Sequence, residues 1–111
     1  MTTATRLCAL VDLVDGGVRR FDVDGHDLAV IRLGGDVYVL GDRCSHADVS
    51  LSEGEVFADE CAIECPKHGS EFDLVTGEPR SLPAVRPVPT YAARVEDGDV
   101  VVELDHAEEA S

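Results

Sequence analysis

The chain has 111 residues, and its 23 acidic against 9 basic side chains give a formal net charge of −14. This charge argues against nucleic acid and anionic membranes as partners, because both carry negative charge themselves. The hydrophobic share is 44%, ordinary for a globular protein, and no apolar run is long enough to span a membrane.

Strand-length segments fill the N-terminal part of the chain. A mostly apolar run predicts a first strand over Arg6–Leu13, and an imperfect alternation predicts a second over Val18–Val23. A third strand is predicted over Leu28–Leu33, with these side chains on one face: Ala29, Ile31 and Leu33. Residues 34–36 then form a tight Gly-Gly-Asp turn into a fourth strand, Val37–Leu40.

The middle of the chain has weaker periodicity. Residues 42–52 predict a loop, and residues 55–64 predict a short hairpin of Glu55–Phe57 with Ala62–Glu64. A second loop at 66–70 leads to a returning strand, Glu71–Leu74, and to a turn over residues 76–79. Four of the five prolines then exclude a helix over residues 79–89 and indicate an extended connector.

The C-terminal part predicts one more hairpin. Tyr91–Glu96 and Val100–Leu104 flank Asp97-Gly98, a strong signal for a tight turn. Residues 105–111 are acidic and small, and we expect a flexible tail there. About ten short strands with frequent turns predict an all-β fold, an antiparallel sandwich or barrel. We expect a single domain over residues 1–111, and the absence of a secretory signal predicts a cytoplasmic protein, with a monomer as the default.

Two short motifs carry metal-ligand residues. Cys44-Ser45-His46 and Cys65-Pro66-Lys67-His68 each offer one thiolate and one imidazole, and 18 residues separate them. Such a Cys2His2 set suits one zinc ion, or a two-iron cluster with two Cys on one iron and two His on the other. Zinc fingers usually pair Cys with Cys and His with His, so the mixed order here favours the cluster.

These motifs and their surroundings resemble the Rieske [2Fe–2S] family, in particular the small ferredoxins of multicomponent ring-hydroxylating oxygenases. The resemblance runs from Leu7 to Leu104 and is strongest over residues 43–73. It implies a Rieske fold, in which a small cluster-binding part, about residues 42–75, is inserted into a base of antiparallel sheets. It also implies one [2Fe–2S] cluster per chain, with Cys44 and Cys65 on the inner iron and His46 and His68 on the outer iron.

The same resemblance bears on the reduction potential. High-potential members carry a disulfide between the two ligand loops, whereas this chain has no Cys at residues 47–49 or at Lys67. They also carry a Tyr that donates to a cysteine sulfur, where this chain has Phe72. One donor, Ser70, is kept. Since donors to cluster sulfur raise the potential, we expect the low end of the Rieske range.

The remaining Cys and His residues have plainer interpretations. Cys8 and Cys61 lie in apolar stretches, which predicts reduced, buried thiols. His26 and His106 have no partner ligand nearby in the sequence, which predicts surface residues. The proline-containing segment 80–89 either covers the cluster, as in Rieske folds, or is a surface crossover.

The sequence therefore predicts a one-electron carrier. The resemblance implies a flavin-dependent, NAD(P)H-linked reductase as donor and a terminal oxygenase or another redox enzyme as acceptor. We expect no catalytic site of its own, because no two-His, one-carboxylate iron motif and no nucleotide-binding loop is present. The acidity either keeps the protein soluble or steers its docking, or both. Three alternatives stay open: a small subunit of a nitrite-reductase-like enzyme, an iron–sulfur assembly accessory, and a zinc-stabilised interaction module.

Overall fold

Three antiparallel sheets make up the computed structural model, which describes all residues except 1, 24, 43–49, 68, 81–86 and 106–111. The first sheet has the order β1 (Thr2–Ala9), β10 (Asp99–Asp105), β9 (Ala93–Glu96). The second has the order β2 (Val18–Val23), β3 (His26–Leu33), β4 (Asp36–Gly41), β8 (Thr90–Tyr91). The third has the order β5 (Glu55–Phe57), β6 (Ala62–Glu64), β7 (Glu71–Asp73).

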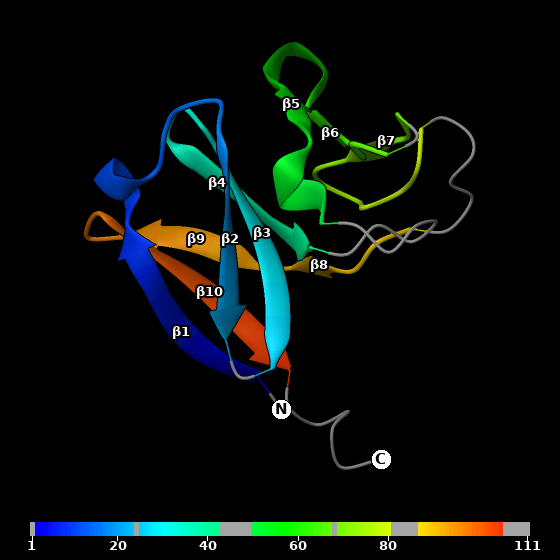
Figure 1. Ribbon diagram of the computed structural model, residues 1–111. Coiled ribbons are helices and arrows are strands. Elements are labelled where there is room, and N and C mark those ends of the chain that lie inside the picture. The colour runs from blue at the N-terminus through cyan, green and yellow to red at the C-terminus, as the bar shows by residue number, and fades with distance from the viewer. Residues whose placement is uncertain (1, 24, 43–49, 68, 81–86, 106–111) are drawn as a thin grey trace.

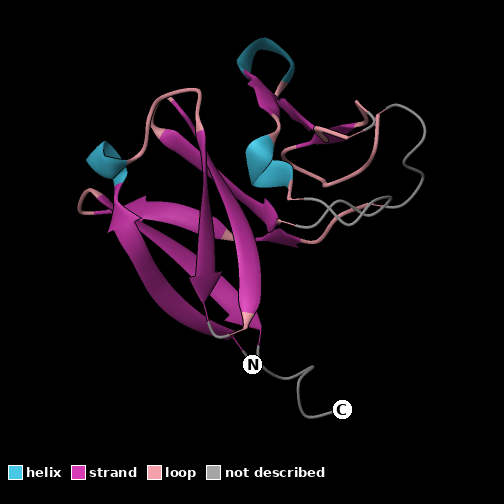
Figure 2. Cartoon of the chain, in the orientation of Figure 1, coloured by secondary structure: helices cyan, strands magenta, loops and turns pink. Residues whose placement is uncertain are grey.

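The predicted all-β class is confirmed. The described residues form no α-helix, only three short 3-10 turns: η1 (Leu10–Asp12), η2 (Leu51–Glu53) and η3 (Ala58–Glu60). None of their helices is long and apolar enough to cross a membrane. The small sheet β5–β6–β7 lies between β4 and β8 in the sequence, although these two strands are hydrogen-bonded neighbours. Figures 1 and 2 show it as a separate layer beside the two larger sheets, which form the base.

Most predicted strands agree with the structure to within two residues at either end, and β2, β5 and β6 agree in full. The predicted tight turn over residues 34–36 is confirmed at Gly34 and Gly35, whereas Asp36 already belongs to β4 and pairs with Leu33. The Asp97-Gly98 turn is confirmed too, with φ of 51° and 79° at its two residues.

Two predicted strands are wrong. The first strand begins at Thr2 because β10 extends to Asp105 and supplies a partner there. It ends at Ala9, since Leu10 starts a 3-10 turn and donates its N–H to the Gly98 carbonyl at 2.8 Å. The predicted strand Tyr91–Glu96 is split at Ala92, because β8 pairs with β4 whereas β9 pairs with β10.

Two apolar cores lie on opposite faces of β3 and β4. One face of β3 presents Leu28 and Val30 to a core between the two base sheets. The other face presents Ala29 and Ile31 to a core shared with the inserted part, and Leu33 packs partly against it, as the alternation predicted. The second core consists of these buried residues: Ala29, Ile31, Leu40, Leu51, Ile63, Cys65, Phe72, Leu74 and Val88. The base and the inserted part therefore share one wall.

Gly54 allows the inserted part to pack closely. A Cβ at this position would overlap the backbone carbonyl oxygen of Glu64 and lie 3.2 Å from that of Leu51. The backbone at Gly54 is extended, with φ −87° and ψ −173°, a conformation that any residue adopts. The requirement for glycine is therefore steric.

We expect Gly54→Ala to lower the free energy of unfolding by about 1–3 kcal/mol, the usual cost of overpacking. Gly35→Ala is the matched control, since its Cβ would meet no atom within 4 Å. Urea denaturation of both variants beside the parent protein measures the difference. Equal midpoints for the two variants would contradict the close approach.

Candidate metal centre

Of the four predicted ligands, only Cys65 lies in the described part of the chain; Cys44, His46 and His68 fall outside it. The described residues alone contain no group of three or more His, Cys, Asp or Glu side chains placed to hold a metal ion. The four-residue ligand set therefore stays a prediction. The structure shows how the chain on either side of these residues is held.

Cys65 directly follows β6 and is fully buried in the core shared by the base and the inserted part. Its N–H donates to the Ser70 carbonyl at 2.7 Å, and its own carbonyl accepts the Gly69 N–H at 3.0 Å. Gly69 has a φ of +75°, which favours glycine. Cys65 is buried whereas Pro66 and Lys67 are exposed, so the thiol of this turn lies inside the protein and its tip lies at the surface.

This arrangement fits an iron–sulfur cluster. A buried Cys supplies the thiolate that iron requires, and a tight turn leaves backbone amides near the sulfur. Ser70 is fully buried and follows Gly69, in keeping with its predicted role near the cluster. Phe72 is fully buried as well, and its ring has no hydroxyl group to donate.

Backbone hydrogen bonds hold the described residues that flank segments 43–49 and 81–86, which themselves lie outside the described part of the chain. Residues 43–49 contain Cys44 and His46, and across them the Leu51 N–H donates to the Asp42 carbonyl at 2.5 Å. Residues 81–86 are bounded by Arg80, whose N–H donates to Glu71 at 2.6 Å, and by Val88, whose N–H donates to Gly77 at 2.9 Å. Both predictions for segment 80–89 concern residues 81–86, which lie outside the described part of the chain.

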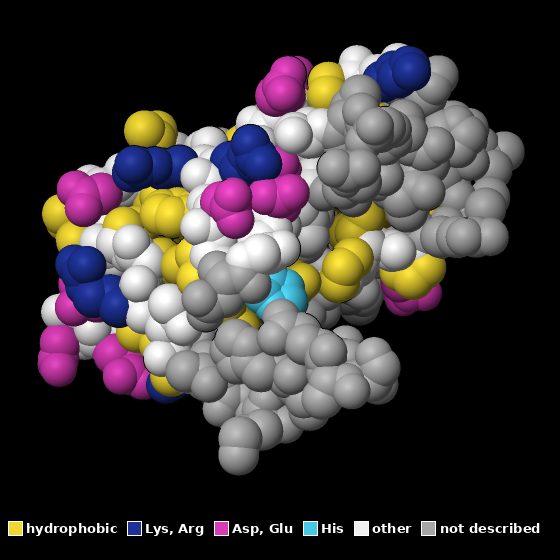
Figure 3. All heavy atoms as spheres, turned by 60° about the horizontal axis from the view of Figure 1, so that its bottom comes forward, with side chains coloured by type: hydrophobic (Ala, Val, Ile, Leu, Met, Phe, Trp, Pro, Cys, Tyr) yellow, Lys and Arg dark blue, Asp and Glu magenta, His cyan; other side chains and the backbone are white. Residues whose placement is uncertain are grey.

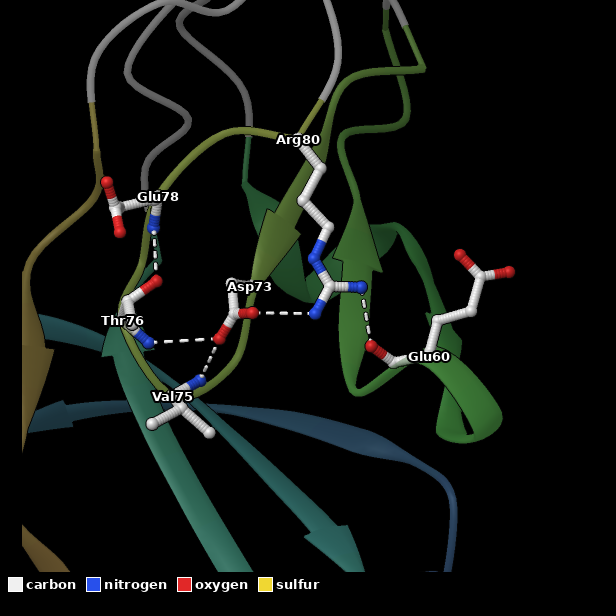
Figure 4. A network of polar contacts seen from close by, with 6 residues as sticks. All are labelled: Glu60, Asp73, Val75, Thr76, Glu78 and Arg80. Atoms are coloured by element: carbon white, nitrogen blue, oxygen red, sulfur yellow. Dashed lines mark hydrogen bonds and ion pairs between the residues drawn. The ribbon is translucent and has the colours of Figure 1, made fainter.

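Asp73 and Arg80 organise the turn after β7, as Figure 4 shows. The Arg80 guanidinium donates to Asp73 Oδ2 at 2.6 Å and to the Glu60 carbonyl at 2.5 Å. Asp73 Oδ1 accepts the N–H groups of Val75 at 2.8 Å and Thr76 at 3.1 Å. The hydrogen bond from Arg80 lowers the pKa of Asp73, burial opposes this, and the two N–H groups lower it further.

Neither Asp73 nor Arg80 was predicted to have a role. Asp side chains in turns commonly accept backbone N–H groups that follow shortly after them, and Thr76-Gly77 comes three residues after Asp73, so the role of Asp73 was open to prediction. The partner Arg80 was not, because its contact with Glu60 depends on how β6 and β7 pair.

Several arginines of the described surface are paired with acidic side chains. Arg6, Arg20, Arg80 and Arg94 each form an ion pair with a carboxylate. On the face seen in Figure 3, Lys and Arg side chains stand beside Asp and Glu side chains. Glu71 differs: burial first, and then Glu60 and Glu64, raise its pKa. Three carboxylates, those of Glu60, Glu64 and Glu71, therefore lie close to one another beside the turn that contains Cys65.

The other Cys and His predictions have mixed outcomes. Cys8 is buried in the core of the base, as predicted, and burial raises the pKa of its thiol. Cys61 is only half-buried. The surface prediction for His26 is wrong: the side chain is half-buried, and its ring meets Tyr91 edge to face with centroids 5.9 Å apart. His106 lies outside the described residues.

Comparison with known proteins adds independent findings. Residues 3–92 match the model of the Rieske [2Fe-2S] domain. The 3-phenylpropionate/cinnamic acid dioxygenase ferredoxin subunit of Escherichia coli (strain K12) is 39% identical over 101 residues, which cover 91% of this chain and 93% of that protein.

Two solved structures are similar as well. The ferredoxin of carbazole 1,9a-dioxygenase from Nocardioides aromaticivorans IC177 is 40% identical with a TM-score of 0.88, over 90% of this chain and 96% of that one. A structure of the complex of reduced oxygenase and oxidized ferredoxin in carbazole 1,9a-dioxygenase contains a chain that is 39% identical with a TM-score of 0.82. That match covers 89% of this chain and 91% of the other.

Proposed function

Because the chain belongs to the Rieske [2Fe–2S] family, we propose that it is a one-electron carrier and not an enzyme that converts a substrate. The observation that carries the proposal is similarity over almost the full length to ferredoxin components of dioxygenases. The buried Cys65 below an exposed turn tip supports it.

The ligands of the cluster are Cys44 and Cys65 on the inner iron and His46 and His68 on the outer iron. When bound, the cluster supplies a one-electron couple. The protein's own part is to hold these side chains and to keep one side of the site apolar. The cluster-binding part corresponds to about residues 42–75 of a single Rieske domain over residues 1–111.

The partners follow from the relatives. One similar ferredoxin was solved in complex with its reduced oxygenase, which supports a terminal oxygenase as acceptor for this chain too. The donor in this proposal is a flavin-dependent, NAD(P)H-linked reductase. A cytoplasmic location and a monomeric state stay predictions.

The three alternatives predict other outcomes. A zinc-stabilised module is colourless and contains one zinc ion without sulfide. An assembly accessory passes its cluster rapidly to an apoprotein. A nitrite-reductase-like small subunit without the cluster does not require Cys65 or the other three ligands.

Metal analysis of purified protein tests the proposal. We expect two iron and two acid-labile sulfide per chain, and an uptake of one electron per chain in an anaerobic dithionite titration, because one cluster is a one-electron couple. Cys65→Ala removes a ligand and is expected to abolish the cluster. Cys8→Ala, a buried Cys in the other core, is the matched control and keeps iron and sulfide at the parent level. One zinc with no sulfide, or a Cys65→Ala variant with full iron, would overturn the proposal.

The potential is a separate prediction. Rieske potentials range from about −150 to +300 mV, and donors to the cluster sulfurs move them upward. Phe72 is buried without a hydroxyl group, so we expect a midpoint below zero against the hydrogen electrode. Redox titration followed by absorption measures it, and a midpoint well above zero would show that other donors replace the missing tyrosine.

A further inference from the structure

Asp42 has an unusual environment. Among the residues that the structure describes, it is the only charged side chain that is buried, with 2% exposure. It directly follows β4 and directly precedes residues 43–49, the segment with Cys44 and His46. A buried carboxylate is costly unless hydrogen bonds and an opposite charge compensate it, so its contacts need an explanation.

The backbone and the side chain of Asp42 both accept hydrogen bonds from residues that follow this segment. The carbonyl accepts the Leu51 N–H at 2.5 Å, and Oδ1 accepts the Ser52 N–H at 2.8 Å. On the other side, the Asp42 N–H donates to the Asp27 carbonyl in β3 at 2.9 Å. One residue thus fixes both ends of a seven-residue segment to the base.

Arg20 supplies the opposite charge. Its Nε lies 3.3 Å from Asp42 Oδ2, and its terminal nitrogen lies 2.8 Å from Asp27 Oδ1. Arg20 belongs to β2 and its side chain is 52% exposed, so it reaches the buried carboxylate from the surface of the base. The ion pair therefore joins strand β2 to the residue that directly precedes the segment with Cys44 and His46.

We propose that Asp42, with Arg20 as its counter-charge, is a positioning residue that fixes the placement of Cys44 and His46. The backbone hydrogen bond between Asp42 and Leu51 already links the end of β4 to the start of η2. The buried charge adds a second bond, to Ser52, and a fixed partner in the base. Residues that orient metal ligands from outside the ligand set typically change metal affinity about 10–100-fold when removed. The inference rests on the proposed function.

The test compares Asp42→Ala, Asp42→Asn and Arg20→Gln with the parent protein. Arg94→Gln is the matched control, because Arg94 also binds two carboxylates, those of Glu96 and Glu103, but in the other base sheet. Three properties are measured: iron release to a chelator without denaturant, the EPR g-values of the reduced protein, and the midpoint potential.

We expect Asp42→Ala to release iron about 10-fold faster or more, with altered g-values. Asp42→Asn keeps an acceptor oxygen for Ser52 and loses the charge, so it is expected to restore the parent g-values. The potential rises in Asp42→Asn, since removing a negative charge favours the reduced state, and falls in Arg20→Gln for the opposite reason. Arg94→Gln behaves as the parent does.

Other outcomes separate the hypotheses. Parent g-values and parent iron release in Asp42→Ala, whatever its melting temperature, would overturn the positioning role and leave the carrier function intact. Parent iron release in Arg20→Gln, with the ion pair to Asp42 removed, would show that Arg20 takes no part in the positioning. A parent protein without iron and sulfide would overturn both proposals. If Asp42→Ala does not fold, iron release from Arg20→Gln decides the question: faster release than from the parent supports the positioning role, and the parent rate overturns it.

Discussion

Three backbone hydrogen bonds at the end of β4 hold the inserted part on the base. The Gly41 N–H donates to Pro89 at 2.8 Å, the Asp42 N–H donates to Asp27 at 2.9 Å, and the Asp42 carbonyl accepts the Leu51 N–H at 2.5 Å. They join β3, the start of η2 and the chain that returns after the inserted part. Gly41 allows this approach, since a Cβ there would lie 2.9 Å from the Pro89 ring.

The shared wall of β3 and β4 makes this junction rigid. Ile31 and Leu40 are fully buried against the inserted part, while Leu28 and Val39 are buried against the other base sheet. Burying such a side chain contributes about 1.5–3 kcal/mol, so both faces of the wall contribute to stability. An electron carrier benefits from this, because ligands on rigid elements keep their geometry when the charge of the cluster changes.

Local patterns in the sequence predicted most of the strands. The hairpin of β5 and β6 and the turn at Asp97-Gly98 depend on residues that are neighbours in the sequence, and both were predicted correctly. The split at Ala92 and the end of β1 were missed, since each is decided by a partner strand far away in the sequence. Resemblance to a known family, rather than periodicity, supplied the insertion between β4 and β8.

The site shows the same contrast between local patterns, which could be predicted from the sequence, and tertiary contacts, which could not. Spacing and residue type predicted the ligand set, and the structure places one of its members, Cys65, in a buried position that suits the prediction. The supporting residues were not recognised: an Asp before a loop and an Arg in an edge strand have ordinary surface roles in most sequences. Only the tertiary contacts between β2, β3 and η2 show that Asp42 is buried and paired with Arg20.

The central claim is that two thiolates and two imidazoles hold one cluster in this chain. Pulsed EPR on the dithionite-reduced protein tests it most directly, because it detects nitrogen atoms bonded to the iron. The account predicts a signal that is absent before reduction and shows strong coupling to two histidine nitrogens. A reduced cluster without coupled nitrogen, or no signal after reduction, would contradict the assignment of His46 and His68 as ligands.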